Sequence, residues 1–304
     1  MTKLKFGVDF DYYLDFKALK RLVSECEQLG FDSAWVMDHL IWQGKGDVLE
    51  CLAVLSGLAT TTNRIRLGSM VLCNSYRNPA LLAKMAATID MISEGRLEFG
   101  IGAGWKEDEY RAYGYEFPSA AVRIEQLREA LIIITKMWTE EKSSFNGAHY
   151  SISDAICAPK PIQKPHPPIW VGGGGGKLIK VAAELADGFN TVFTTPEECN
   201  AKMRILSEHC RAINRDPSEV RRSWVGELIL CRTPEEIASK ISELKPSDAS
   251  PEDFVLRRLI GTSRQCVDKI EEYVDAGINY MIVISRKSHE DLEVFAREVI
   301  PSFR

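Results

Sequence analysis

The sequence predicts an α/β fold in which eight strand-helix units close into a (β/α)8 TIM barrel. Strand-like and helix-like segments alternate along the whole chain, which is typical of a parallel sheet with crossover helices. Eight strand-like segments lie within 304 residues, a length that suits one barrel domain spanning residues 1–304. A doubly wound open sheet would show the same alternation, but the length and the strand count favour the closed barrel.

The first half of the barrel is predicted from hydrophobic periodicity. A strand at 4–8 is followed by apolar residues at three- and four-residue spacing from Phe16 to Leu29, which predict a helix. That helix is predicted to stop at Gly30, because glycine readily adopts the left-handed conformation that terminates helices. A second helix is predicted near 49–59, and the next strands are predicted at 33–37, 65–72 and 97–102.

The second half begins with a helix and a long connection. Apolar residues from Ile124 to Trp138 form a helical stripe, and the proline-bearing stretch 145–168 follows it. This stretch is too long for a simple turn, so we predict an insertion over one barrel face before the fifth strand at Ile169. A further helix is predicted around 203–213, and the remaining strands are predicted at 189–193, 223–230 and 280–284.

Three junctions between a helix and the following strand are alike. Gly30, Gly188 and Gly277 each precede an apolar residue and then Asp or Asn. We interpret each glycine as a left-handed residue that ends a helix. The recurrence supports a chain of repeated αβ units.

Composition and charge narrow the function class. The formal net charge is −5, with acidic and basic residues interspersed, which argues against nucleic acid or an anionic membrane as the main partner. We find no apolar run long enough to span a membrane and no signal peptide, so we expect a cytoplasmic protein that acts on a small molecule. The eight cysteines form no Cys-x-x-Cys pair, so we expect reduced thiols rather than a disulfide framework or a metal site.

The strongest functional signal is an apolar strand that runs into five glycines and then a helix, IWVGGGGGKL at 169–178. The backbone N–H groups of Gly173, Gly174, Gly175 and Gly176 can approach an anion closely, and the start of the helix adds unpaired donors. Lys177 adds a full positive charge. The spacing fits neither a P-loop nor the dinucleotide fingerprint. A phosphate-binding turn is favoured over a flexible surface loop.

A second glycine-rich run lies at 100–104. It lacks the third spaced glycine of a phosphate motif, and the first basic residue near it is Lys106. We predict that it lets the backbone approach a planar ring closely at the barrel opening.

Residues near the predicted strand ends are candidates for chemistry, because barrel active sites lie at the carboxyl ends of the strands. Asp38 and His39 follow the second strand: an imidazole can exchange a proton near neutral pH, and a carboxylate can orient a bound ring. A capping aspartate beside a structural histidine is the alternative. Cys73, Trp42 and Trp105 are further candidates, the tryptophans either for an aromatic pocket or for ordinary packing.

Five runs carry the most distinctive pattern of the chain. They are GFDSAWVMDH at 30–39, RIRLGSMV at 64–71, RNPALLAK at 77–84, ISEGRLEFGIGAGW at 92–105, and the five-glycine turn. Together and in this order they resemble the bacterial-luciferase-like superfamily, in particular its coenzyme F420-dependent oxidoreductases. The resemblance covers nearly the whole chain and implies a barrel that binds a flavin or a deazaflavin at the carboxyl ends of its strands.

The resemblance also implies roles for individual residues. The turn up to Lys177 would hold the cofactor phosphate. Asp38 and His39 would lie beside the ring, with His39 in proton transfer or in positioning. Met70 and Val71 would be joined by a non-prolyl cis peptide that supports a bent ring, and family members commonly pair as homodimers.

The implied reaction is hydride transfer between F420 and a small organic substrate. In the sugar-phosphate dehydrogenases of this family a catalytic glutamate matches Trp105, so the tryptophan argues against sugar-phosphate oxidation. An FMN-dependent monooxygenase and a non-catalytic flavin-binding protein are the alternatives. Lys177, Lys180 and the pair Arg64 and Arg66 are candidates for contacts with the acidic F420 tail.

Overall fold

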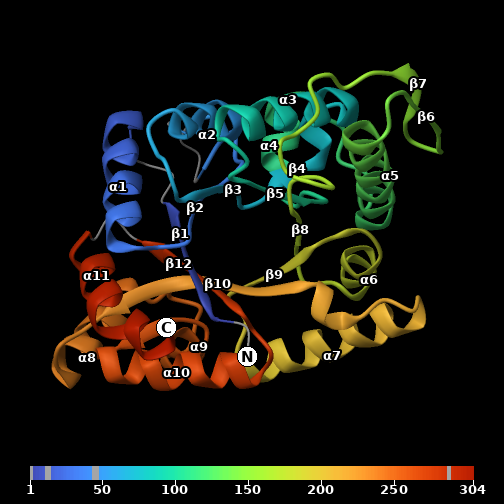
Figure 1. The fold of residues 1–304 in the computed structure, drawn as a ribbon. Coiled ribbons are helices and arrows are strands. Elements are labelled where there is room, and N and C mark those ends of the chain that lie inside the picture. The colour runs from blue at the N-terminus through green and yellow to red at the C-terminus, as the bar shows by residue number, and fades with distance from the viewer. Residues whose placement is uncertain (1–2, 11–14, 43–47, 286–288) are drawn as a thin grey trace.

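The computed structural model describes residues 3–10, 15–42, 48–285 and 289–304, and its centre is a closed barrel of parallel strands (Figure 1). Their order round the barrel is β1 (Lys5–Phe10), β2 (Ser33–Val36), β3 (Arg66–Ser69), β5 (Leu97–Gly102), β8 (Ile169–Gly172), β9 (Gly188–Val192), β10 (Arg221–Leu230) and β12 (Tyr280–Ser285). β12 pairs with both β10 and β1, which closes the sheet. The predicted (β/α)8 barrel is confirmed, and the open sheet is excluded.

Two short strands extend this barrel at the carboxyl ends of its main strands. β4 (Leu72–Cys73) continues the course of β3 and pairs with the end of β5. β11 (Leu259–Gly261), which the sequence analysis did not predict, pairs with the end of β10. Both additions lengthen the sheet on the side where the candidate residues lie.

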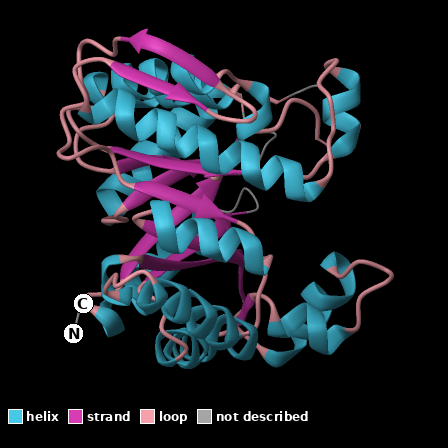
Figure 2. Ribbon diagram, turned by 90° about the vertical axis from the view of Figure 1, so that its right-hand side faces the viewer, coloured by secondary structure: helices cyan, strands magenta, loops and turns pink. Residues whose placement is uncertain are grey.

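Helices surround the strands in both views (Figures 1 and 2). They are α1 (Phe16–Leu29), α2 (Cys51–Ala59), α3 (Pro79–Ile92), α4 (Glu107–Ala112), α5 (Ala120–Thr139), α6 (Gly176–Leu185), α7 (Pro196–Ala212), α8 (Pro234–Leu244), α9 (Pro251–Leu256), α10 (Ser263–Asp275) and α11 (His289–Val294). The helices predicted at 16–29 and near 49–59 are confirmed as α1 and α2. The other two predicted stripes lie in α5 and α7. Among the described helices, none combines the length and the apolar character that a membrane crossing requires.

Local sequence explains most of the helix boundaries. Asp15 caps α1 by accepting the backbone N–H of Ala18, and Gly30 ends it with a φ of 84°. Gly277 has a φ of 92° after α10, as predicted. The prediction for Gly188 is wrong, because this residue begins β9. A Cβ on Gly188 would lie 2.2 Å from the ring of Trp170, so glycine is needed there for packing.

The predicted insertion is confirmed as a hairpin followed by an extended segment. β6 (Ser143–Asn146) and β7 (Ser151–Ala155) pair in antiparallel fashion beside α5 (Figure 1). Glu129 of α5 accepts three successive backbone N–H groups of the hairpin turn. The segment after β7 then passes α3, where Gln163 hydrogen-bonds to Asp90. The insertion therefore lies along the outer helices, and it contacts the residues after β4 through Tyr150 and Asn74.

Large side chains fill the amino half of the barrel interior. Trp35, Trp170 and Tyr280 are buried and pack edge to face, with ring centroids 5.6–6.2 Å apart. The buried carboxylate of Glu98 accepts a hydrogen bond from Nε1 of Trp170 and pairs with Arg66. The amino end is thus closed by packed side chains, which leaves the carboxyl end for a site.

Candidate active site

The candidate residues gather at the carboxyl end of the barrel, here called the barrel mouth, because β2, β3, β5 and β8 are parallel. β3 and β5 separate β2 from β8 round the barrel. Asp38 and His39 follow β2, and the glycine turn follows β8. The two strongest sequence signals therefore lie across the barrel mouth from each other.

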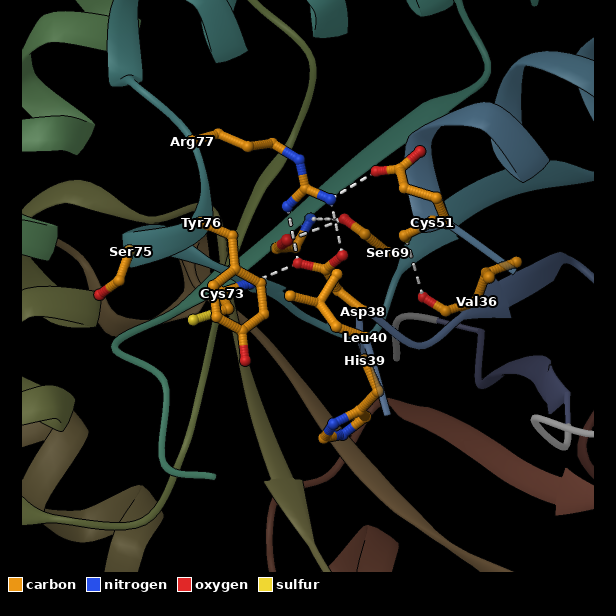
Figure 3. A network of polar contacts seen from close by, with 12 residues as sticks. Val36, Asp38, His39, Leu40, Cys51, Ser69, Cys73, Ser75, Tyr76 and Arg77 are labelled. Carbon is orange, nitrogen blue, oxygen red and sulfur yellow. Dashed lines mark hydrogen bonds and ion pairs between the residues drawn. The ribbon is translucent and has the colours of Figure 1, made fainter. Parts of the chain in front are cut away.

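Asp38 anchors the segment after β2. Both of its buried carboxylate oxygens pair with Arg77, at 2.7 and 2.8 Å, and the backbone N–H of Cys73 donates to the same carboxylate at 2.8 Å (Figure 3). Burial favours the neutral form of Arg77, but Asp38 and Glu50 outweigh it and raise the pKa of Arg77, so this side chain stays charged. Asp38 thus ties β2 to β4, and its predicted contact with a bound ring would be additional to this role.

His39 is held by a carboxylate from a distant part of the chain. Its Nδ1 lies 3.0 and 2.9 Å from the two oxygens of Glu109, which belongs to α4 after β5. The ring points away from the pair of Asp38 and Arg77 (Figure 3). Because Nδ1 faces Glu109, the opposite ring nitrogen, Nε2, faces away from that carboxylate.

Glu109 is itself almost fully buried, with 1% of its surface exposed. It accepts the backbone N–H groups of Leu40 and Ile41 at 3.0 and 2.9 Å and the hydroxyl of Tyr76 at 2.9 Å. Burial raises its pKa, but the hydrogen bonds from His39, Ile41 and Tyr76 outweigh burial and lower the pKa below the ordinary glutamate value. Glu109 is therefore ionised at neutral pH.

Two aromatic rings lie next to His39. The ring of Trp42 lies 4.6 Å from the imidazole, and that of Trp105 lies 5.9 Å away and nearly perpendicular to it. Trp105 is 66% exposed, whereas most large aromatic side chains of this chain are buried. The structure thus brings His39, Trp42 and Trp105 together, as the aromatic-pocket interpretation requires.

Cys73 lies deeper than the other candidates. Its thiol is 3.1 Å from the hydroxyl of Tyr110, and burial raises its pKa to about 11. The thiol is therefore protonated at neutral pH, and its predicted contact with a cofactor stays a prediction. All eight cysteines are buried and free, which agrees with the expectation of reduced thiols.

The peptide bond between Met70 and Val71 is cis, as the family resemblance implies. The Val71 side chain lies against two glycines on neighbouring strands. A Cβ on Gly102 of β5 would approach it to 2.9 Å, and a Cβ on Gly172 of β8 to 3.0 Å. A Cβ on Gly100 would lie 2.0 Å from the carbonyl oxygen of Ser69. These glycines make room for the segment after β3, which is a use that the sequence analysis did not foresee.

The glycine turn has the strand, turn and helix that were predicted. Gly173 has a φ of 143°, and a Cβ there would clash with Leu178, so this position requires glycine. Gly175 is the N-cap of α6 and provides no side-chain hydrogen bond, which leaves the amides of the first helical turn without a side-chain acceptor. Beyond its chain neighbours and its own helix backbone, a Cβ on Gly175 or Gly176 would meet no heavy atom of the described residues within 4 Å. The N–H groups of Gly173 and Leu178 already donate to the carbonyl oxygens of Asn190 and Gly175, so Gly173 does not offer the donor that was predicted for it. The amides between these two residues form the cradle that fits a phosphate.

Two lysines lie at this turn. Lys177 is exposed at the second position of α6, as the sequence predicts. Lys202 of α7 donates from Nζ to the carbonyl oxygen of Gly174 at 3.0 Å. Lys202 is a basic residue that the sequence analysis missed, because 28 residues separate it from the turn.

The prediction that Arg64 and Arg66 contact a cofactor tail is wrong. Arg66 is the first residue of β3, and it pairs with Glu98 at the amino end of the barrel, opposite the glycine turn. Arg64 and Arg66 line a surface hollow of about 380 Å³ at that end. Neither arginine lies at the barrel mouth.

Sequence analysis also missed Glu109 and Arg77, which hold His39 and Asp38 at the barrel mouth. Glu109 lies 70 residues from His39, and Arg77 lies 39 residues from Asp38, so no local spacing connects them. The only signal was that Glu109 falls in a short acidic run directly after β5, which is where barrel sites are built.

Comparison with known proteins gives a consistent picture. A family model described as luciferase-like monooxygenase matches residues 2–255. The F420-dependent glucose-6-phosphate dehydrogenase of Amycolatopsis mediterranei (strain U-32) is 27% identical, over 91% of this chain and 92% of that protein. The FMNH(2)-dependent dimethylsulfone monooxygenase of Pseudomonas putida is 26% identical, over 94% of this chain and 87% of that protein.

The fold is also shared with solved structures. An F420-dependent secondary alcohol dehydrogenase in complex with an F420-acetone adduct superposes with a TM-score of 0.88. The alignment covers 99% of both chains at 21% sequence identity. At this identity the likeness supports the barrel fold and nothing finer.

Proposed function

Because the chain belongs to the luciferase-like monooxygenase family of oxidoreductases, we propose that it transfers a hydride between coenzyme F420 and a small, uncharged organic substrate. The glycine turn after β8 would hold the cofactor phosphate, and the barrel mouth would hold the ring and the substrate. The F420-dependent relatives, which align with over nine tenths of this chain, support the choice of cofactor.

The observation that carries the proposal is the open set of backbone donors at the start of α6. Amides without an acceptor, next to the positive end of a helix dipole, favour an anion. Among the residues that the structure describes, none crowds a Cβ on Gly175 or Gly176 within 4 Å, which leaves space for that anion. Lys177 and Lys202 add positive charge at the same place.

The residues across the barrel mouth suit a reaction that moves a proton together with a hydride. When bound, F420 supplies a ring carbon that accepts or donates the hydride. His39 can accept the hydroxyl proton of an alcohol or return it to a carbonyl oxygen. Trp42 and Trp105 would enclose the substrate and exclude water from it.

The surroundings of His39 also favour an uncharged substrate. Two tryptophan rings offer apolar faces rather than charged partners. Arg77, whose guanidinium pairs with the neighbouring Asp38, is already neutralised by Asp38 and Glu50. An uncharged alcohol or carbonyl compound therefore fits better than a sugar phosphate, in agreement with the tryptophan at position 105.

A second candidate is an FMN-dependent monooxygenase. The dimethylsulfone monooxygenase of Pseudomonas putida matches this chain at nearly the same identity as the F420-dependent relatives do. A phosphate cradle accepts the phosphate of either cofactor, so the turn does not discriminate between the two. Discrimination between F420 and FMN must come from contacts with the cofactor tail and with the ring.

A side-by-side titration of the purified protein with F420 and with FMN tests the proposal. We expect F420 to bind more tightly, and we expect its absorbance to bleach when a member of a panel of small secondary alcohols is added. Tighter binding of FMN would favour the monooxygenase. Binding of F420 without turnover of any alcohol or carbonyl compound would favour a non-catalytic binding protein, and failure to bind either cofactor would refute both enzyme assignments.

A further inference from the structure

We propose that Glu109 is a positioning residue that fixes the proton of neutral His39 on Nδ1 and so makes Nε2 the atom that exchanges protons with the substrate. The reaction in this statement rests on the proposed function. The tautomer does not, because it follows from the contact between Nδ1 and the Glu109 carboxylate.

The hydrogen-bond pattern determines which atom carries the proton. Both oxygens of Glu109 lie within 3.0 Å of Nδ1. An ionised carboxylate has no hydrogen to give, so the nitrogen facing it must be the donor. The low pKa of Glu109 keeps the carboxylate ionised at neutral pH. A neutral imidazole has one N–H only, so Nε2 is then the acceptor.

The other partners of Glu109 keep it in this state and in this place. Leu40, Ile41 and Tyr76 all present N–H or O–H donors to it. Burial raises the pKa of Tyr76 far above neutral pH, so its hydroxyl keeps its hydrogen. A protonated Glu109 would lose one of these hydrogen bonds, because each oxygen already accepts from more than one donor.

Glu109 also fixes the direction in which the imidazole points. It binds the two backbone amides that directly follow His39 as well as the ring itself. A rotation of the ring about its χ angles would break the Nδ1 contact and remove one hydrogen bond from a buried, ionised carboxylate, which costs free energy. Nε2 is thereby held on the side of the ring away from Glu109, and the rings of Trp42 and Trp105 lie 4.6 and 5.9 Å from the imidazole.

A purely structural role is the competing explanation: Glu109 would pin residues 39–41 without controlling the proton. Glu109→Gln separates the two explanations. The glutamine keeps a carbonyl oxygen that can accept the backbone amides, but its NH2 group can donate to Nδ1. The amide contacts can therefore survive while the preference for one tautomer is lost.

The first test is a measurement of the imidazole 15N chemical shifts in the cofactor-free protein, at a pH at which His39 is neutral. The His39 signals are assigned by their loss in His39→Asn. We expect the Nδ1–H tautomer in the wild type, a mixture or the Nε2–H tautomer in Glu109→Gln, and the wild-type pattern in Glu107→Gln. Glu107 is an exposed residue of the same helix that pairs with Arg111, which makes it a matched control.

An Nε2–H tautomer in the wild type, or an unchanged tautomer in folded Glu109→Gln, would overturn the proposal. If Glu109→Gln does not fold, the wild-type tautomer still decides. Tyr76→Phe then serves as a milder variant, which should keep the Nδ1–H tautomer because the contact between Glu109 and His39 remains.

The second test is steady-state kinetics with F420 and the alcohol found to react. We expect Glu109→Gln to lower kcat by about 100-fold with little change in the KM for F420, as is typical when a proton-transfer group is misaligned. Glu107→Gln should match the wild type. The expected tautomers in a protein that turns over nothing would leave the positioning role in place and refute the proposed function instead. Conversely, hydride transfer with an unchanged kcat in Glu109→Gln would support the proposed function and refute the positioning role of Glu109.

Discussion

The two sides of the barrel mouth differ in the groups that form them: mainly paired side chains around His39, and backbone amides at the glycine turn. Around His39, buried and half-buried groups from the segment after β2, from β4 and the residues after it, and from α4 satisfy one another through ion pairs and hydrogen bonds. Around the glycine turn, the backbone lies open and its side chains are absent or exposed. On the first side the donors and acceptors are paired in advance, whereas the second side keeps the amides between Gly173 and Leu178 for a ligand.

This difference indicates a division of labour. A preorganised network orients a reacting group and contributes little to affinity, because its hydrogen bonds exist before any ligand arrives. Open amides at a helix start gain their partner only on binding, so they contribute to affinity. Substitutions on the His39 side should therefore change turnover or stability, and those at the turn should change cofactor binding.

The largest expected effect is that of His39→Ala. We expect turnover to fall by roughly 10²–10⁴-fold, the range attributed to general acid-base catalysis. The affinity for F420 should stay within about tenfold, because the phosphate contacts are untouched. Single-turnover kinetics and a fluorescence titration measure the two quantities separately. Equal turnover in the variant would remove His39 from the mechanism, and a large loss of affinity would break the division between the two sides.

Arg77→Met tests whether the His39 side depends on buried charge. The substitution leaves the carboxylate of Asp38 buried without its cation, and we expect the free energy of unfolding to fall by about 3–5 kcal/mol. Urea denaturation followed by circular dichroism measures this loss. Arg111→Met removes an exposed ion pair from α4 and should change the stability by no more than about 0.5 kcal/mol. Equal effects of the two substitutions would contradict the proposed role of the buried pair.

Gly175→Asp tests the glycine turn, because it should keep or raise the thermal stability while it lowers the affinity for F420. Aspartate is a favoured N-cap residue and meets no atom at this position, so thermal stability should hold or rise. The same carboxylate would occupy the amides and repel phosphate, and we expect F420 affinity to fall about 100-fold. Gly175→Ala should bind more tightly than Gly175→Asp. Unchanged affinity in the aspartate variant would refute the phosphate assignment.

The smallest expected effect is that of Lys202→Met. Its amino group lies at the edge of the turn and is partly exposed, so we expect a two- to fivefold loss of F420 affinity, or about 0.5–1 kcal/mol. The loss should shrink as salt is added, because exposed charges are screened. Lys136→Met is the matched control, since Lys136 is a partly exposed lysine of α5 that pairs with Glu140. Titrations at low and high salt measure both variants.

The sequence predicted what is encoded locally. The barrel strands follow from short apolar runs, and the glycine turn follows from ten consecutive residues, so both were found. The cis peptide between Met70 and Val71 was expected only through the family resemblance.

Contacts between distant segments could not be read in the same way. Glu109 and Lys202 reach their partners only after the barrel closes. Gly188 leaves room for the ring of Trp170, which lies on the neighbouring strand β8. Arg66 was misplaced because its position at the start of β3, and not its proximity to a motif, decides at which end of the barrel it lies.

Val71 has a consequence for how this barrel can vary. Its isopropyl group fills the space left by the missing side chains of Gly102 and Gly172, so the three positions form one steric unit drawn from β5, β8 and the segment between β3 and β4. A methyl group added at either glycine would need a smaller residue at position 71 to compensate. Substitutions at these three positions should therefore be correlated during evolution, because a single larger residue at either glycine is tolerated only together with a smaller residue at position 71.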